Sequence, residues 1–129
     1  MSAPADFFKS RDGNAEARVQ RAILEWCALV APELIIYHTP NGGLRSKVEA
    51  ARLRWQGVLP GVPDLTLVGQ DGQLRYIEVK GPSGALSPEQ RAFQNRCVAM
   101  RIPFAVARSV DDVRRAFREW QIPTREASS

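Results

Sequence analysis

Residues 63–80 read PDLTLVGQDGQLRYIEVK and place Asp64, Glu78 and Lys80 on or beside two apolar runs. Leu, Val and Ile recur in both runs, and the Asp71-Gly72 pair between them is typical of a tight turn that joins two β-strands. A charge within such a strand costs free energy unless it is paired or holds a metal ion. Asp64, Glu78 and Lys80 therefore need either structural partners or a chemical role.

The length of the turn decides which residues of the two strands face each other. A two-residue turn at Asp71-Gly72 pairs Asp64 with Val79, whereas a three-residue loop over 70–72 pairs Asp64 with Glu78. The longer loop is favoured, because its third position requires a left-handed residue and glycine stands there. We therefore predict that the two carboxylates face each other across adjacent strands.

Two opposed carboxylates repel each other in a sheet, and a divalent cation removes that conflict. Side chains alternate along a strand, so Lys80 points to the same side as Glu78. A lysine at that position can orient a water molecule or stabilise charge that develops on a phosphate oxygen. The three residues together predict metal-assisted hydrolysis of a phosphodiester bond. The alternative is an ion pair at the edge of a sheet, where charges guard against aggregation.

The rest of the chain alternates between helical and extended patterns. Helices are expected over 14–30, 46–56, 87–101 and from 109 to about 121, with strands over 33–38, 64–69, 74–80 and 102–107. Asn14, Ser46, Ser87 and Ser109 are the candidate N-caps. The order α-β-α-β-β-α-β-α predicts an α/β fold with a small mixed sheet flanked by helices. We expect a single domain over 14–121, between a flexible N-terminal arm at 1–13 and a flexible tail at 122–129.

The composition is that of a globular protein, with 129 residues, 44% hydrophobic and 25% charged. No apolar run is long enough to span a bilayer and no signal-peptide pattern begins the chain, so we expect a cytoplasmic protein without a membrane partner. Cys27 and Cys97 fall in helical patterns and are expected to be free, buried thiols. With His38 they lack the spacing of a zinc site, and His38 is expected to be a hydrogen-bonded residue at a strand end.

Basic residues outnumber acidic residues by 18 to 14, and most of them are arginine, which pairs with phosphate through two parallel hydrogen bonds. A turn and a short helix concentrate this charge and could contact the DNA backbone through N–H groups and cations. The alternative is a simple turn followed by a solvated helix face. The residues expected to bind DNA in this segment are Asn41, Gly42, Arg45, Lys47, Arg52 and Arg54.

Three segments resemble a known family: GVPDLTLV (61–68), EVKGPSGALSPEQ (78–90) and PFAVARSVDDV (103–113). They are similar to the VRR-NUC domain, the virus-type replication-repair branch of the PD-(D/E)xK nuclease superfamily. The resemblance extends from Glu16 to about Trp120 and so covers nearly the whole chain. It implies the restriction-endonuclease-like core of that superfamily, in which a mixed sheet is flanked by helices.

The resemblance also implies a metal site that holds Mg²⁺ or Mn²⁺, between which the oxygen ligands do not discriminate. Asp64, Glu78 and the backbone carbonyl of Val79 would be ligands. The family pattern includes an acid from the first helix, and Glu16 fills that place in this chain. For Glu16 the alternative is a favourable interaction with the dipole of its own helix.

Lys80 corresponds to the catalytic lysine of the family. Gln20 lies four residues after Glu16 on the same helix face and would stand at the margin of the site. For Gln90, a capping role toward Ser87 is sufficient to explain its position.

The activity implied by the resemblance is that of a metal-dependent DNA endonuclease in DNA repair. We expect selectivity for branched DNA, as in Holliday-junction resolvases, and a homodimer as the acting form. Two alternatives remain open: a flap or duplex-trimming nuclease with the same site, and a non-catalytic DNA-binding module on the same fold.

Overall fold

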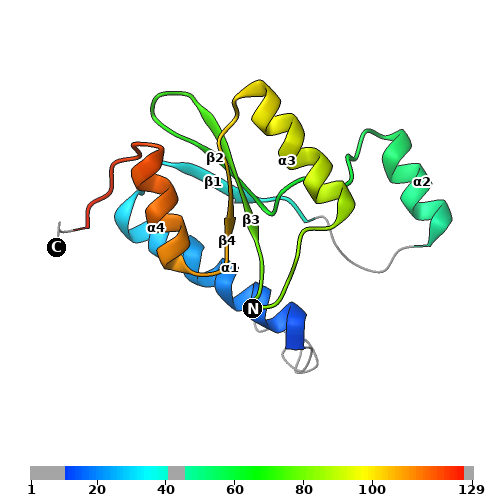
Figure 1. The fold of residues 1–129 in the computed structure, drawn as a ribbon, viewed down its shortest axis with the longest axis horizontal. Coiled ribbons are helices and arrows are strands. Elements are labelled where there is room, and N and C mark those ends of the chain that lie inside the picture. The colour runs from blue at the N-terminus through cyan, green and yellow to red at the C-terminus, as the bar shows by residue number, and fades with distance from the viewer. Residues whose placement is uncertain (1–10, 41–45, 127–129) are drawn as a thin grey trace.

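The computed structural model describes residues 11–40 and 46–126, with side chains from residue 15 onward. The elements follow the predicted order, and Figure 1 shows their arrangement. They are α1 (Arg11–Val30), β1 (Ile35–His38), α2 (Lys47–Trp55), β2 (Leu65–Val68), β3 (Leu74–Val79), α3 (Pro88–Met100), β4 (Phe104–Ala107) and α4 (Val110–Glu119). In this part of the chain, no helix is both long and apolar enough to cross a membrane.

The four strands form one mixed sheet in the order β1-β2-β3-β4. Strand β2 pairs antiparallel with both β1 and β3; a short hairpin joins β2 to β3, whereas the connection from β1 to β2 contains α2. Strand β4 pairs parallel with β3, because the chain crosses back through α3 before it enters β4. The predicted α/β architecture with a mixed sheet is therefore confirmed.

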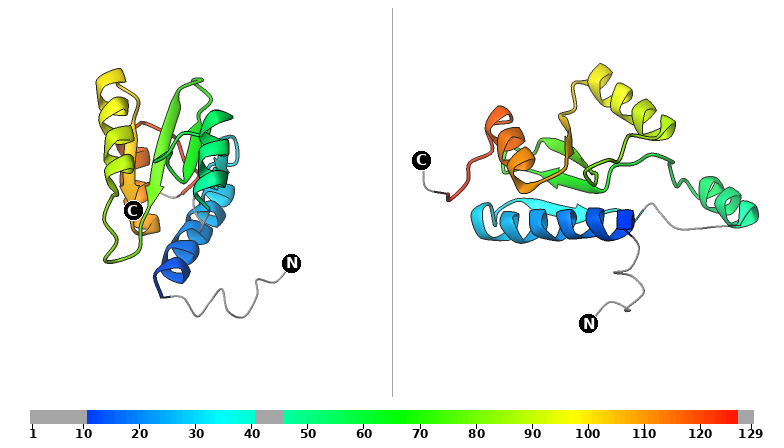
Figure 2. Two further views of the ribbon diagram at one scale, coloured as in Figure 1. Left: turned by 90° about the vertical axis from the view of Figure 1, so that its right-hand side faces the viewer. Right: turned by 60° about the horizontal axis from the view of Figure 1, so that its bottom comes forward.

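Helices cover both faces of the sheet, and Figure 2 shows α3 and α1 on opposite sides of it. Strand residues alternate, so every second side chain of β2 and β3 enters the core beneath α1 and α4. This core joins Ile23 of α1 and Phe117 of α4 to the strand residues Leu65, Leu67, Ile77 and Val79. On the other face, Tyr76 meets Phe93 of α3 edge to face, with ring centroids 5.1 Å apart. Glu78 lies on this second face with Tyr76, whereas Arg75 points to the side of α4, where it donates to the Trp120 carbonyl.

The β2–β3 hairpin has the predicted three-residue loop. Leu65 pairs with Ile77 and Val68 with Leu74, and the Gly69 N–H donates to the Gln73 carbonyl at 3.2 Å. Gly72 has φ of 76°, the left-handed conformation that the third loop position requires. One step back along this register, Asp64 stands opposite Glu78.

The ends of the domain differ from the sequence-based boundaries. Helix α1 begins at Arg11, so Asn14 lies inside the helix and is not its N-cap. Residues 122–126, assigned to a flexible tail, lie against the body of the domain: Ile122 is 8% exposed, and Glu126 accepts hydrogen bonds from Arg114 and Trp26. This docking could not be predicted from the sequence, because one partner of Glu126 is Trp26, which lies 100 residues earlier in the chain. The remaining arm and tail residues, 1–10 and 127–129, lie outside the described part of the chain.

Candidate active site

Asp64 is fixed at the point where β2 begins, between the neighbouring strands β1 and β3. Its side-chain Oδ2 accepts a hydrogen bond of 2.8 Å from the Val79 N–H. Its backbone carbonyl accepts from the Thr39 N–H at 2.9 Å and lies 2.8 Å from Nδ1 of His38. His38 therefore has the structural role predicted for it, and the position of the Asp64 carboxylate is set by the sheet itself.

Glu78 is a buried carboxylate with an incomplete set of partners. Only 2% of the residue is exposed. Its Oε1 accepts a hydrogen bond of 2.9 Å from Nε2 of Gln90 and lies 3.9 Å from Nζ of Lys80. Its Oε2 is buried and has no hydrogen-bond partner within the described residues. A buried carboxylate oxygen without a hydrogen-bond partner costs free energy, so Oε2 is a candidate atom for binding a ligand that the protein itself does not supply.

The surroundings of Glu78 favour its neutral form. Burial raises the pKa of the Glu78 carboxyl to about 9. The Asp64 carboxylate contributes to the rise of this pKa, because it accepts a hydrogen bond that only the protonated Glu78 can donate and because its charge opposes a second negative charge. The nearby Lys80 lowers this pKa and Glu16 raises it. Three acidic groups therefore influence one another here, with one lysine opposing them. Such a strongly shifted pKa beside a specific charge partner is typical of functional sites.

Glu16 reaches this site from α1, and the loop after β3 brings it close to Lys80. A Cβ atom at Gly84 would lie 3.3 Å from Cδ of Lys80 and 3.4 Å from Oε1 of Glu16. A Cβ atom at Gly81 would lie 3.6 Å from Cγ of Glu16. Gly84 thus leaves room for the lysine, whereas at Gly81 the distance is that of an ordinary contact. Gln20, one turn further along α1, is half-buried, and its side chain makes no hydrogen bond to any other described residue.

Gln90 contacts the site although the sequence analysis gave it a capping role only. The capping role is correct: the Ser87 N–H donates to Oε1 of Gln90 at 2.8 Å, and the Gln90 N–H donates to the Ser87 hydroxyl. The same amide group donates from Nε2 to Glu78. A glutamine carries both an acceptor and a donor, so one function does not exclude the other. That second capacity was the signal available in the sequence.

Arg108 is a second contact that sequence reasoning missed. Its Nη1 donates a hydrogen bond of 2.6 Å to the Gly81 carbonyl, at the start of the loop that packs on Lys80 and Glu16. Its backbone N–H is held by Asp112 of α4. The contact arises because β4 lies parallel beside β3, which no local pattern around Arg108 reveals.

The donor set can accept a hard divalent cation with help from other ligands. Among the residues that the structure describes, no three Asp, Glu, His or Cys side chains are grouped as a ready-made metal cage. Asp64 and Glu78 face each other, and Oε2 of Glu78 accepts no hydrogen bond from the described part of the chain. Magnesium is usually bound by one or two carboxylates together with water and substrate phosphate. The residues present fit such a partly solvated ion.

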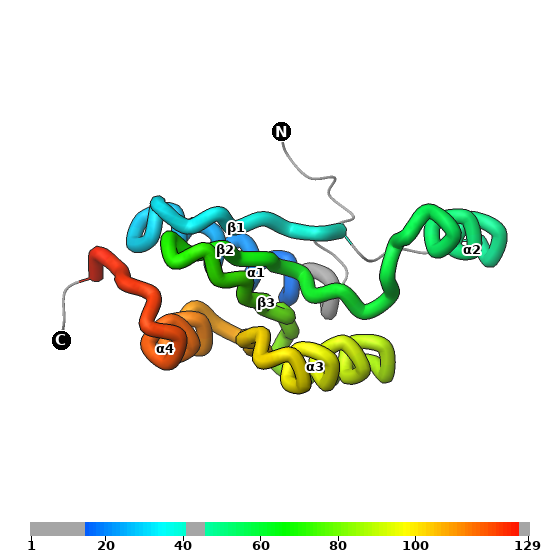
Figure 3. The backbone as a smooth tube through the Cα atoms, turned by 90° about the horizontal axis from the view of Figure 1, so that it is seen from above, coloured from blue at the N-terminus to red at the C-terminus, as the bar shows by residue number. Residues whose placement is uncertain are grey.

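Helix α2 carries part of the predicted DNA-binding surface and stands apart from the sheet, as Figure 3 shows. Lys47, Arg52 and Arg54 are all exposed on it. Asn41, Gly42 and Arg45 lie outside the described residues. No residue of α2 is buried, and Trp55 is 87% exposed. Trp55 therefore does not pack into the core of the domain.

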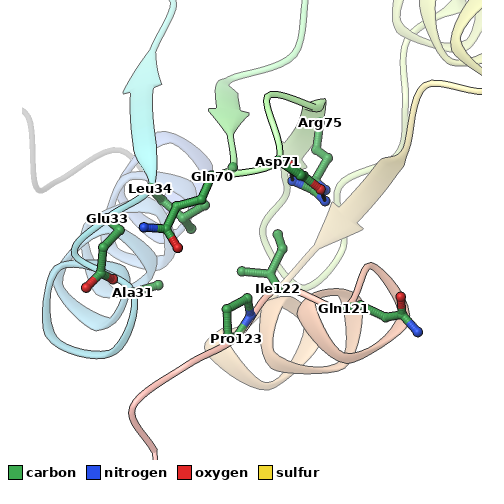
Figure 4. Close-up of a pocket in the computed structure, with 10 residues that line it drawn as sticks. Ala31, Glu33, Leu34, Gln70, Asp71, Arg75, Gln121, Ile122 and Pro123 are labelled. Carbon is green, nitrogen blue, oxygen red and sulfur yellow. Dashed lines mark hydrogen bonds and ion pairs between the residues drawn. The ribbon is translucent and has the colours of Figure 1, made fainter.

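A cavity of about 120 Å³ lies beside the turn of the β2–β3 hairpin, at the opposite end of these strands from Asp64 and Glu78. Figure 4 shows Arg75 and Asp71 on one side of it, with Ile122 and Pro123 below. Arg75 is 2% exposed and donates to Asp71 at 2.8 Å and to the Trp120 carbonyl at 3.5 Å. This arginine fastens the hairpin turn to the end of α4, so we treat the cavity as part of a structural clamp.

The fold and the site together define a mixed α/β domain with acids and a lysine gathered at one end of a hairpin. A family model described as "VRR-NUC domain" matches residues 11–111. The chain belongs to the VRR-NUC domain family, which is a family of nuclease-type domains. A solved structure described as "VRR_NUC domain protein" matches with a TM-score of 0.63 and 20% identity, over 81% of this chain and 86% of that chain. At this identity the likeness shows the shared fold alone. No curated protein matches the sequence.

Proposed function

We propose that this protein is a metal-dependent endonuclease that hydrolyses phosphodiester bonds of DNA and selects branched DNA. The observation that carries the proposal is the state of Glu78, which is buried opposite Asp64 and whose Oε2 accepts no hydrogen bond from residues 11–40 or 46–126. A purely structural sheet gains nothing from two facing carboxylates. A site for a divalent cation beside a phosphate explains both of them.

Asp64, Glu78, Glu16 and the carbonyl of Val79 are the residues that would hold Mg²⁺ or Mn²⁺. Such an ion supplies a nucleophilic water at neutral pH and neutralises charge on the phosphate. The protein's part is to place these oxygens. Asp64 is oriented by the Val79 N–H and Glu78 by the Gln90 amide, so neither carboxylate has to be ordered when substrate arrives.

Lys80 is the residue we assign to the reacting phosphate. Its Nζ lies 3.9 Å from Oε1 of Glu78. The amino group would therefore be near a phosphate oxygen bound to the metal ion that the carboxylates hold. Gly84 lies beside this side chain and has no Cβ, which would come within 3.3 Å of the Lys80 Cδ. In this position the amino group would orient the attacking water or stabilise charge on a phosphate oxygen.

DNA contact and assembly complete the proposal. Lys47, Arg52 and Arg54 on α2 supply sequence-independent attraction to the phosphate backbone. We propose a homodimer, because β1 is an edge strand with Ile35 60% and Tyr37 52% exposed, and such an edge is a template for pairing with a second copy. The free, buried thiols of Cys27 and Cys97 fit the proposed cytoplasmic location.

The test uses end-labelled four-way junction, flap, single-strand and duplex DNA of shared sequence, each with Mg²⁺, Mn²⁺ or EDTA. Lys80→Ala is the matched variant, because it removes one amino group from the site and leaves both carboxylates. Metal-dependent, symmetric cuts at the junction that disappear in Lys80→Ala are the expected result. Products from flap or duplex DNA alone would show that the proposed active site is correct and that its substrate is flap or duplex DNA and not a four-way junction. DNA binding without products in any metal would favour a non-catalytic module.

A further inference from the structure

A cavity of about 380 Å³ lies between α2 and the first turn of α3, closed below by the loop before β2. Its volume falls within the range of about 300–1,000 Å³ in which proteins bind small organic groups. Leu53 of α2 with Val58 and Pro60 of the loop form apolar walls. Arg54, Glu89 and Gln90 supply the polar groups.

The cavity and the candidate active site share one side chain. Gln90 lines the cavity, and its Nε2 donates the hydrogen bond of 2.9 Å to Glu78. A group bound in the cavity would therefore contact a residue that also contacts the buried carboxylate. This neighbourhood makes the cavity a candidate binding place for part of the substrate of that site.

One wall of the cavity is built tightly. Gly61 has φ of 82°, and a Cβ atom there would lie 2.3 Å from the Glu89 carbonyl oxygen. Only glycine combines this backbone conformation with so close an approach, so the loop is locked against the first turn of α3. The opposite wall is α2, on which Leu53 faces the cavity while Ala51 is exposed and does not line it.

We propose that this cavity receives an unpaired nucleobase of the strand being cut, beside the scissile phosphate. The inference rests on the proposed nuclease function and names the substrate feature that its site selects. Apolar walls fit the two faces of a base, and the Glu89 carboxylate can accept from an exocyclic amino group while it repels a phosphate. Arg54 at the cavity is the partner for the phosphate of the same nucleotide. Taking a base out of a stack costs least where it is already unpaired, so the cavity favours branch points over perfect duplex.

The first experiment compares cleavage of two branched DNAs that differ only in the nucleotide beside the mapped cut, which carries either its base or an abasic site. The parent protein is expected to cut the abasic DNA about tenfold more slowly, near the lower end of the factors of about five to a hundred that stacking of a base contributes, because the cavity walls are aliphatic and not aromatic. Leu53→Trp, which fills the cavity, is expected to cut both DNAs at the slower rate. Ala51→Trp places the same side chain on the exposed side of α2 and should keep the tenfold difference. Equal rates on both DNAs with the parent protein would overturn the proposal.

The second experiment measures binding separately from cleavage. Lys80→Ala is mixed with junction DNA that carries the fluorescent base 2-aminopurine at single positions around the branch. Fluorescence should rise at one position, where the base leaves the stack, and the rise should be lost in the Lys80→Ala/Leu53→Trp double variant. A rise without cleavage by the parent in any metal would remove the nuclease function and retain the pocket. Cleavage without any base dependence would remove the pocket and retain the nuclease function. A cavity closed instead by a second copy of the chain would appear as a change in mass for Leu53→Trp with no change in base dependence, and this also counts against the proposal.

Discussion

The side-chain amide of Gln90 donates a hydrogen bond of 2.9 Å to Oε1 of Glu78 and joins the first turn of α3 to the buried carboxylate of β3. The other end of the same amide accepts from the Ser87 N–H at 2.8 Å and completes the capping box of the helix. The start of α3 and the orientation of Glu78 are thus set by one residue. A residue with two such functions can be tested by removing them separately.

Gln90→Ala removes both functions and is expected to weaken the apparent metal affinity and the cleavage rate by about 10–100-fold, the usual cost of losing a partner behind a metal ligand. Ser87→Ala removes the capping hydroxyl and leaves the bond between Gln90 and Glu78. Both variants should lose about 1 kcal/mol of stability from the weakened cap. The measurement is the Mg²⁺ concentration for half-maximal cleavage beside the denaturation midpoint. Equal metal dependence in the two variants would assign Gln90 to the cap alone.

Glu78 makes the stability of the metal-free protein dependent on pH. Its pKa is about 9 in the folded protein against 4.5 as the ordinary value, so the folded state holds a proton that the unfolded state releases. Stability from this group is therefore complete below about pH 4.5 and is lost as the pH rises toward 9. Glu78→Gln keeps the shape without the charge and should be the more stable protein, by up to about 3 kcal/mol at pH 7.

The measurement for Glu78 is the thermal midpoint of both proteins in EDTA between pH 5 and pH 9. The advantage of Glu78→Gln should widen steadily with pH. Added Mg²⁺ should reduce the advantage, because an ion that binds the ionised carboxylate stabilises only the parent protein. A constant difference across the pH range would mean that Glu78 is ionised and paired in the folded protein.

Local chemistry explains why much of the fold was predictable from the sequence. Gly72 at the third loop position predicted the register that places Asp64 opposite Glu78, and that register is observed. The serine caps were predicted because they depend on residues within one helical turn: Ser46, Ser87 and Ser109 each accept a hydrogen bond from the third residue after them. Signals of this kind act over a few residues and do not need the tertiary structure.

The parts that could not be predicted depend on contacts between distant segments. Arg108 reaches Gly81 only because β4 lies parallel beside β3. Trp26 donates a hydrogen bond to Glu126, which lies 100 residues further along the chain. Because no local pattern reveals this contact, the sequence-based start of the tail at residue 122 was too early. Trp55 is a further case, because an apolar side chain favours burial, yet no residue of α2 is buried and this side chain is exposed.

Arg75 and Asp71 offer a test of the clamp at the far end of the hairpin. Arg75 is buried, whereas the Asp71 side chain is 54% exposed. Asp71→Ala leaves a buried guanidinium without its carboxylate, and Arg75→Met replaces that charge with an apolar chain and leaves Asp71 in contact with water. Asp71→Ala should therefore lower the thermal midpoint more than Arg75→Met, although it removes the more exposed residue. Neither change should affect the metal dependence of cleavage, because both lie at the opposite end of the strands from Glu78.

The edge strand β1 carries the prediction about assembly. Ile35 and Tyr37 point to the same side of this strand and are 60% and 52% exposed, whereas Ile36 between them packs against the core. The double variant Ile35→Lys/Tyr37→Lys places two like charges on that face and should convert a dimer into a monomer, because charged edge strands resist pairing. Mass by light scattering gives the direct answer. Junction cleavage should then change from paired, symmetric cuts to single nicks at the same positions, since each copy retains its own Asp64, Glu78 and Lys80. A parent protein that is already monomeric at the concentrations used for cleavage would rule out this surface as the basis of symmetric cutting.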